Sequence, residues 1–160
     1  MGRVSERHLR YRTKEQIVHD VAFVLSAPLA KGTKWAVLRD VAWVWTEFEG
    51  KYKGCRYWSK CARQQYLKSG SSGLRHEHIV PKDVVIKMLL NLSSPTPEKV
   101  QEVCEKFLIG TVVTMHEDAV LRVFLKIMPP AFDDPDSSDY HNPWLRYRLC
   151  NIEMDCEHAR

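Results

Sequence analysis

Three ionisable side chains stand in a row at His76, Glu77 and His78, between a glycine- and serine-rich loop and Pro81. The β-branched pair before the proline, and the proline itself, predict an extended segment. Side chains alternate along a strand, so the two imidazoles share one face and the carboxylate lies on the other. Imidazoles placed in this way suit a metal ion, or a general base acting on a phosphodiester. A hydrogen-bonded structural feature at the end of a strand is the alternative interpretation.

The composition predicts one globular domain. The chain has 160 residues, 44% of them hydrophobic, which is enough for a single core. A basic N-terminal arm (1–12) and a frayed C-terminus (153–160) are expected to flank that core. No apolar run approaches membrane-spanning length, and no apolar stretch follows the basic arm, so we expect a cytoplasmic protein without a membrane partner. The five cysteines include no CxxC pair, which indicates neither a disulfide framework nor a zinc knuckle.

Residues 51–68, called the basic segment below, differ from the rest of the chain. The segment contains no acidic residue, and its cations are interleaved with tyrosines and a tryptophan. If it is helical from Arg56 onward, then Arg56, Lys60 and Arg63 lie on one stripe. A surface of one charge sign binds phosphate backbones, whereas an ordinary solvated face is the simpler interpretation. The candidate nucleic-acid contacts are Lys53, Arg56, Lys60, Arg63 and, on the neighbouring strand, Arg75.

The surrounding elements predict an α+β fold that is predominantly helical. Apolar spacing and capping signals indicate about six helices, two of which begin with capping boxes at Thr13 and Thr114. Thr33 is expected to cap the second helix, with Gly50 at its end. A small two-stranded β element is expected around 74–80 and 109–114. Glu117 completes the second capping box, so we assign it a structural role before a catalytic one.

The predicted elements from residue 74 onward follow in the order strand, two inserted helices, strand and helix. This order suggests a resemblance to a known enzyme family. Glu77-His78-Ile79-Val80-Pro81 resembles the first motif of the HNH, or ββα-metal, endonuclease superfamily. Geometry rather than the motif suggests His116 or Asp118, at the start of the last helix, as a remaining metal ligand. The resemblance implies that His78 is the general base and Glu77 a metal ligand. It also implies a divalent ion, magnesium or manganese, with zinc or nickel as alternatives. The chain departs from the family pattern because two helices separate the motif from His116.

The first hypothesis is therefore a metal-dependent nuclease of phage–host defence or a mobile element, with DNA favoured over RNA as its substrate. Two further hypotheses are possible. In one of these, the protein is a non-enzymatic module that engages nucleic acid or a protein partner through the basic segment. His76 then caps or bridges structural elements, and Glu77 pairs with Arg75 or Lys82. In the other, His76 and His78 act as base and acid of a metal-free ribonuclease.

Overall fold

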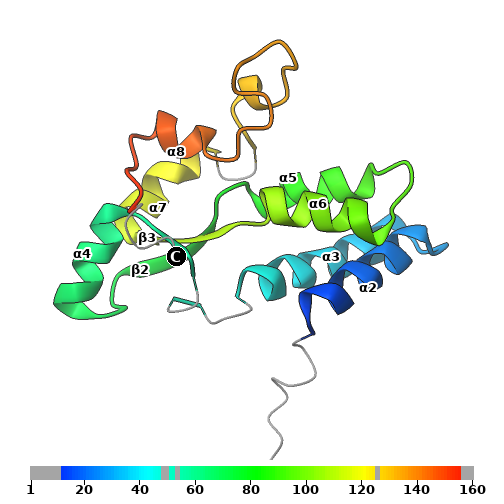
Figure 1. Cartoon of the computed structure of the whole chain (residues 1–160). Helices are drawn as coiled ribbons and strands as arrows, with labels where there is room; N and C mark the ends of the chain where they lie inside the picture. Colours follow the sequence, from blue (N-terminus) through cyan, green and yellow to red (C-terminus); the bar gives the residue numbers. More distant parts are fainter. Residues whose placement is uncertain (1–11, 48–50, 53–54, 125–126, 156–160) are drawn as a thin grey trace, which may run out of the picture.

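Seven α-helices and a three-stranded sheet make up the part of the chain that the computed structural model describes, residues 12–47, 51–52, 55–124 and 127–155 (Figure 1). The fold is therefore α+β and predominantly helical, as the sequence predicts. Within these residues no helix combines the length and the apolar character that crossing a bilayer demands.

Four helices form a bundle at one end of the molecule (Figure 1). They are α2 (Lys14–Ser26), α3 (Lys31–Thr46), α5 (Lys82–Leu90) and α6 (Pro97–Phe107). Helix α2 packs against α3 and α6, and α5 packs against the same two helices. Each contributes one apolar stripe to the main core, which includes Val21, Leu38, Leu89, Val100 and Phe107.

The sheet lies beside this helical bundle. Its strands are β1 (Tyr57–Trp58), β2 (Leu74–His78) and β3 (Gly110–Thr114), in the order β1-β3-β2. Strand β2 runs antiparallel to β3, with His76 opposite Val112, and β1 runs parallel to β3. The predicted strand pair is confirmed, whereas β1 is an addition: two residues are too few to show a period in the sequence.

The remaining helices cover the two faces of the sheet. Helix α4 (Lys60–Ser69) packs on the face of Leu74, in a small core with Trp58 and Val112. Helices α7 (Met115–Leu121) and α8 (Leu145–Leu149) contribute to the core on the opposite face, around Val113. Two 3₁₀ turns, Arg122–Phe124 and Pro130–Phe132, lie in the connection between α7 and α8.

Three predicted element boundaries were wrong. Helix α4 begins at Lys60 rather than Arg56, because Ser59 caps it and the two preceding residues pair with β3. Helix α3 begins at Lys31, before Thr33, with no side-chain cap. At the other end of the chain, residues 153–155 are not frayed, because Met154 pairs with Ser59.

Several predicted features lie outside the described residues. They are most of the N-terminal arm (1–11), Gly50, Lys53 and the last five residues (156–160). The two capping boxes are described, and both are present: Thr13 with Gln16, and Thr114 with Glu117.

Candidate functional site

The two histidines of β2 lie on one face of the strand, against helix α3. His78 is 3% exposed. Its Nε2 atom lies 3.2 Å from the carbonyl oxygen of Ala42 and 3.2 Å from Oγ1 of Thr46. A carbonyl oxygen only accepts hydrogen bonds, so Nε2 carries the hydrogen atom and donates a hydrogen bond to the carbonyl oxygen of Ala42. His78 thus bridges β2 and α3.

Burial decides the charge of both imidazoles. Removal from water disfavours the cation and lowers the pKa of His78 to about 4. The pKa of His76 is also lowered to about 4, mainly by burial and then by the neighbouring His78. Both rings are neutral at pH 7, but a general base with a pKa near 4 is weak, and His78 is closed off from solvent. The geometry therefore gives His78 a structural contact and no access to a substrate.

His76 is a different case, because neither of its ring nitrogens has a hydrogen-bond partner within the described residues. The ring lies beside the rings of Trp43 and His78, with centroids 5.8 Å away in each case. Its Nε2 atom would be only 2.7 Å from a β-carbon placed on Gly110. A side chain at position 110 would thus force the His76 ring to shift from its place between β3 and α3.

Glu77 points to the opposite face of β2, as strand alternation predicts, and there meets Arg146 of α8. The Arg146 guanidinium donates to the Glu77 carboxylate and to the backbone oxygens of His78 and Ile79. Arg146 is 1% exposed. The predicted partners of Glu77, Arg75 and Lys82, are thus replaced by a residue 69 positions away.

The residues expected to bind a metal are not brought together. His116 is exposed at the start of α7, and Asp118 pairs with Arg122 at 3.4 Å. Glu77 is held by Arg146 on the sheet. In the described part of the chain, no group of three or more histidine, cysteine or acidic residues is arranged to hold a metal ion. The donor set of Glu77, His116 and Asp118 therefore does not fit a divalent ion in this structure.

Glu117 has the structural role that its capping box predicts. Its carboxylate accepts hydrogen bonds from the backbone N–H and hydroxyl of Thr114, at 2.8 and 2.9 Å. It also accepts one from the Ser59 hydroxyl at 2.7 Å. The starts of α4 and α7 are joined through this one carboxylate.

The basic segment presents cations to solvent, although not on the predicted stripe. Lys60 is exposed and pairs with Glu153, with Nζ 2.8 Å from the carboxylate. Arg63 is more enclosed: its guanidinium stacks on Trp58 at 4.4 Å and its Nε lies 3.1 Å from the Asp155 carboxylate. The other described cations of this surface are exposed, namely Lys51, Arg56, Lys68 and, on β2, Arg75.

The aromatic residues of the basic segment face inward. Trp58 is 2% exposed, and its indole N–H donates to the carbonyl oxygen of Cys55 at 2.9 Å. Tyr66 packs edge-on against Trp58, and the Tyr52 hydroxyl donates to the backbone oxygen of Leu74. These rings anchor the segment to the sheet.

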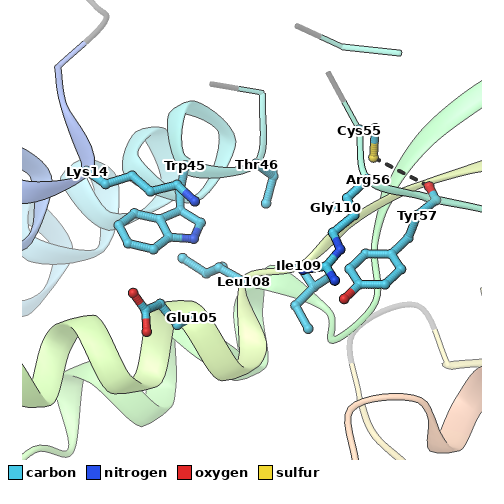
Figure 2. Close-up of a pocket in the computed structure, with 10 residues that line it drawn as sticks. All are labelled: Lys14, Trp45, Thr46, Cys55, Arg56, Tyr57, Glu105, Leu108, Ile109 and Gly110. Carbon is cyan, nitrogen blue, oxygen red and sulfur yellow. Dashed lines mark hydrogen bonds between the residues drawn. The ribbon is translucent and has the colours of Figure 1, made fainter. Parts of the chain in front are cut away.

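A pocket of about 460 Å³ opens where the basic segment meets the four-helix bundle (Figure 2). Figure 2 shows Lys14, Trp45 and Glu105 on one side of it and Arg56 and Tyr57 on the other, with Leu108 between the two groups. No local pattern in the sequence indicates this pocket, because its walls come from four separate segments of the chain.

Comparison of the chain with known protein families, with characterised proteins and with solved structures finds no match. The resemblance to HNH endonucleases therefore rests on residues 77–81 alone.

Proposed function

We propose that the protein binds nucleic acid through the phosphate backbone and does not cleave it. The proposal is supported above all by the combination in residues 51–68 of outward cations and inward aromatic rings. Exposed lysine and arginine side chains contact phosphates, whereas rings that are buried in the protein cannot stack on bases. We therefore expect binding that depends strongly on salt and little on sequence.

The pairing of Lys60 with Glu153 is compatible with this proposal. Both side chains are largely exposed, and an exposed ion pair contributes little to stability because water screens it. A phosphate can therefore replace the Glu153 carboxylate at little cost. Arg63, stacked on Trp58 and held by Asp155, is assigned to the fold instead.

We expect duplex DNA to be the preferred ligand, and the compartment to be the cytoplasm. The four cysteines that the structure describes are all free thiols, the state that a reducing compartment maintains.

The test is fluorescence anisotropy with a labelled DNA duplex at several salt concentrations. We expect Lys60→Ala and Lys68→Ala each to weaken binding and to lower the salt slope by about one. Lys87→Ala is the matched control, since Lys87 is an exposed lysine on α5, and it should leave both quantities unchanged. Absence of salt-dependent binding to DNA and to structured RNA would refute the proposal.

The metal-dependent nuclease remains a second candidate because of one observation. Strands β2 and β3 are antiparallel, and α7 follows β3 directly and packs on both strands. Apart from α5 and α6, which are inserted between the two strands in the sequence, this is the element order of a ββα-metal nuclease. Plasmid cleavage with magnesium, manganese or chelator present would test it, with His116→Ala and Asp118→Ala beside the wild type. Metal-dependent cutting that these surface substitutions abolish at unchanged melting temperature would establish the nuclease. Intact plasmid in every condition would exclude it.

A further inference from the structure

Exposed apolar side chains gather on α7 and on the 3₁₀ turn that continues it, outside the four-helix bundle (Figure 1). Nine large hydrophobic side chains of the described residues are exposed, and four of them lie between residues 115 and 127. Met115 is 52% exposed and Val123 is 73% exposed. Soluble proteins seldom collect exposed apolar side chains in one place, and such collections mark interaction surfaces. This part of the molecule is therefore a candidate interface.

Helical spacing brings the centre of this surface into one line. Met115, Ala119 and Val123 follow one another at intervals of four positions, and all three are exposed. Residues four apart lie above one another on a helix. The opposite side of α7 carries Glu117 and Leu121, which are buried. The line through Met115, Ala119 and Val123, called the outer face of α7 below, thus points to solvent and has its smallest side chain in the middle.

An acid and a base border one edge of the outer face. Asp118 and Arg122 are four positions apart and pair with each other at 3.4 Å, with the Arg122 side chain 67% exposed. His116 and Val120, both exposed, lie along the other edge. Since the charges of Asp118 and Arg122 balance, this face has no excess of positive charge that would attract a phosphate backbone.

The order of side chains along the outer face is complementary to itself. A half-turn about an axis that passes through Ala119, perpendicular to the helix, places a second copy of α7 antiparallel to the first. Met115 then lies opposite Val123 of the second copy, and the reverse contact forms as well. Arg122 comes next to Asp118 of the second copy, so both ion pairs can form between the copies instead of within each one. The small side chain of Ala119 lets the two helices approach closely at the axis.

We infer that two copies of this chain associate through the outer face of α7, as an antiparallel pair of helices around a two-fold axis at Ala119. The end segments outside the described residues, 1–11 and 156–160, are rich in charged side chains and do not match an apolar face. One short helix and one turn make a small interface, so we expect a dissociation constant in the micromolar range. The inference uses no residue of the basic segment and is independent of the proposed binding of DNA.

The test is sedimentation velocity of the full chain, free of nucleic acid, between about 1 and 500 μM. We expect the wild type to pass from monomer to dimer over this range. Val123→Asp should weaken the dimer about tenfold or more, because it places a carboxylate opposite Met115 of the second copy. Phe23→Asp is the matched control, since Phe23 is 75% exposed on α2, and it should leave the dissociation constant unchanged. Both positions are solvated, so neither substitution should move the melting temperature appreciably.

Charge reversal tests the two-fold arrangement itself. Asp118→Arg and Arg122→Asp should each weaken self-association, because like charges then meet between the copies. An equimolar mixture of these two variants should associate at least as strongly as the wild type, since the copy with two cations faces the copy with two carboxylates. The inference is overturned if the wild type stays monomeric throughout, if Phe23→Asp weakens the dimer as much as Val123→Asp, or if the mixture does not associate. A monomeric wild type whose affinity for DNA falls with Val123→Asp would likewise overturn it and assign the face to nucleic acid.

Discussion

At His76 and His78 the fold removes two imidazoles from water. The sequence pattern predicted that they share a face, and they do, on the side of β2 that meets α3. Residue types and strand alternation do not indicate how deeply a side chain is buried. For this reason His78, a candidate general base in the sequence, proved to be a buried residue that links β2 to α3. The consequence for the protein is a stability that depends on pH.

We predict that the free energy of unfolding falls as the pH is lowered from about 6.5 to about 4. The folded protein holds both rings with pKa values lowered from 6.5 to about 4, so the unfolded chain binds more protons in this window. Protonation therefore favours unfolding, by at most about 3 kcal/mol for each ring. Urea denaturation at several pH values measures the effect.

His76→Met serves as the comparison for this pH dependence. Methionine fills a similar volume without polar nitrogens, so the variant should lose about half of the pH dependence and be the more stable protein at pH 5. An unchanged pH dependence would mean that His76 is hydrated in solution.

We predict that Gly110→Ala destabilises the protein by about 1–3 kcal/mol. The added β-carbon would lie 2.7 Å from Nε2 of His76 and 3.1 Å from the β-carbon of Thr46. A double-mutant cycle with His76→Ala tests the cause, because removal of the ring should relieve most of the penalty. Additive effects of the two substitutions, measured by denaturation, would contradict a direct clash.

At the scale of elements, local signals were predictable and distant pairings were not. Each of the capping boxes at Thr13 and Thr114 is contained within four consecutive residues of the sequence, and both are present in the structure. The start of α4 was misplaced because β1 exists only through its pairing with β3, more than fifty positions further along the chain. Arg146 was missed as the partner of Glu77 because the two residues are 69 positions apart and no residue near Glu77 indicates the pairing.

Arg146 joins α8 to β2, and we predict that Arg146→Met costs about 3–5 kcal/mol of stability. The substitution leaves the Glu77 carboxylate and the backbone oxygens of His78 and Ile79 without their donor. Arg148→Met is the matched control, because Arg148 is exposed and pairs at the surface with Asp139. It should shift the melting temperature by much less. Equal shifts for the two arginines would argue against a buried link.

At the scale of the whole molecule, the chain returns at its end to the basic segment. The backbone N–H groups of Lys60 and Asp155 donate to Glu153 and Trp58 at 2.9 and 2.8 Å, which places residues 153–155 beside the start of α4. Sequence reasoning assigned these residues to a frayed end, because the last few residues of most domains are poorly ordered unless a tertiary contact holds them. The return also explains why a segment without acidic residues still has acidic neighbours.

We predict that Glu153→Gln raises the affinity for duplex DNA by up to about fivefold. Glu153 competes with phosphate for Lys60, and an exposed pair of this kind is weak, so its loss changes the affinity only modestly. Stability should hardly change, since both side chains are largely solvated. Glu102→Gln, at an exposed position on α6, alters the net charge equally without touching Lys60. Anisotropy titrations at one salt concentration compare the two, and equal gains would assign the effect to net charge alone. A gain confined to Glu153→Gln would mean that the C-terminal segment sets how strongly the basic segment engages its ligand.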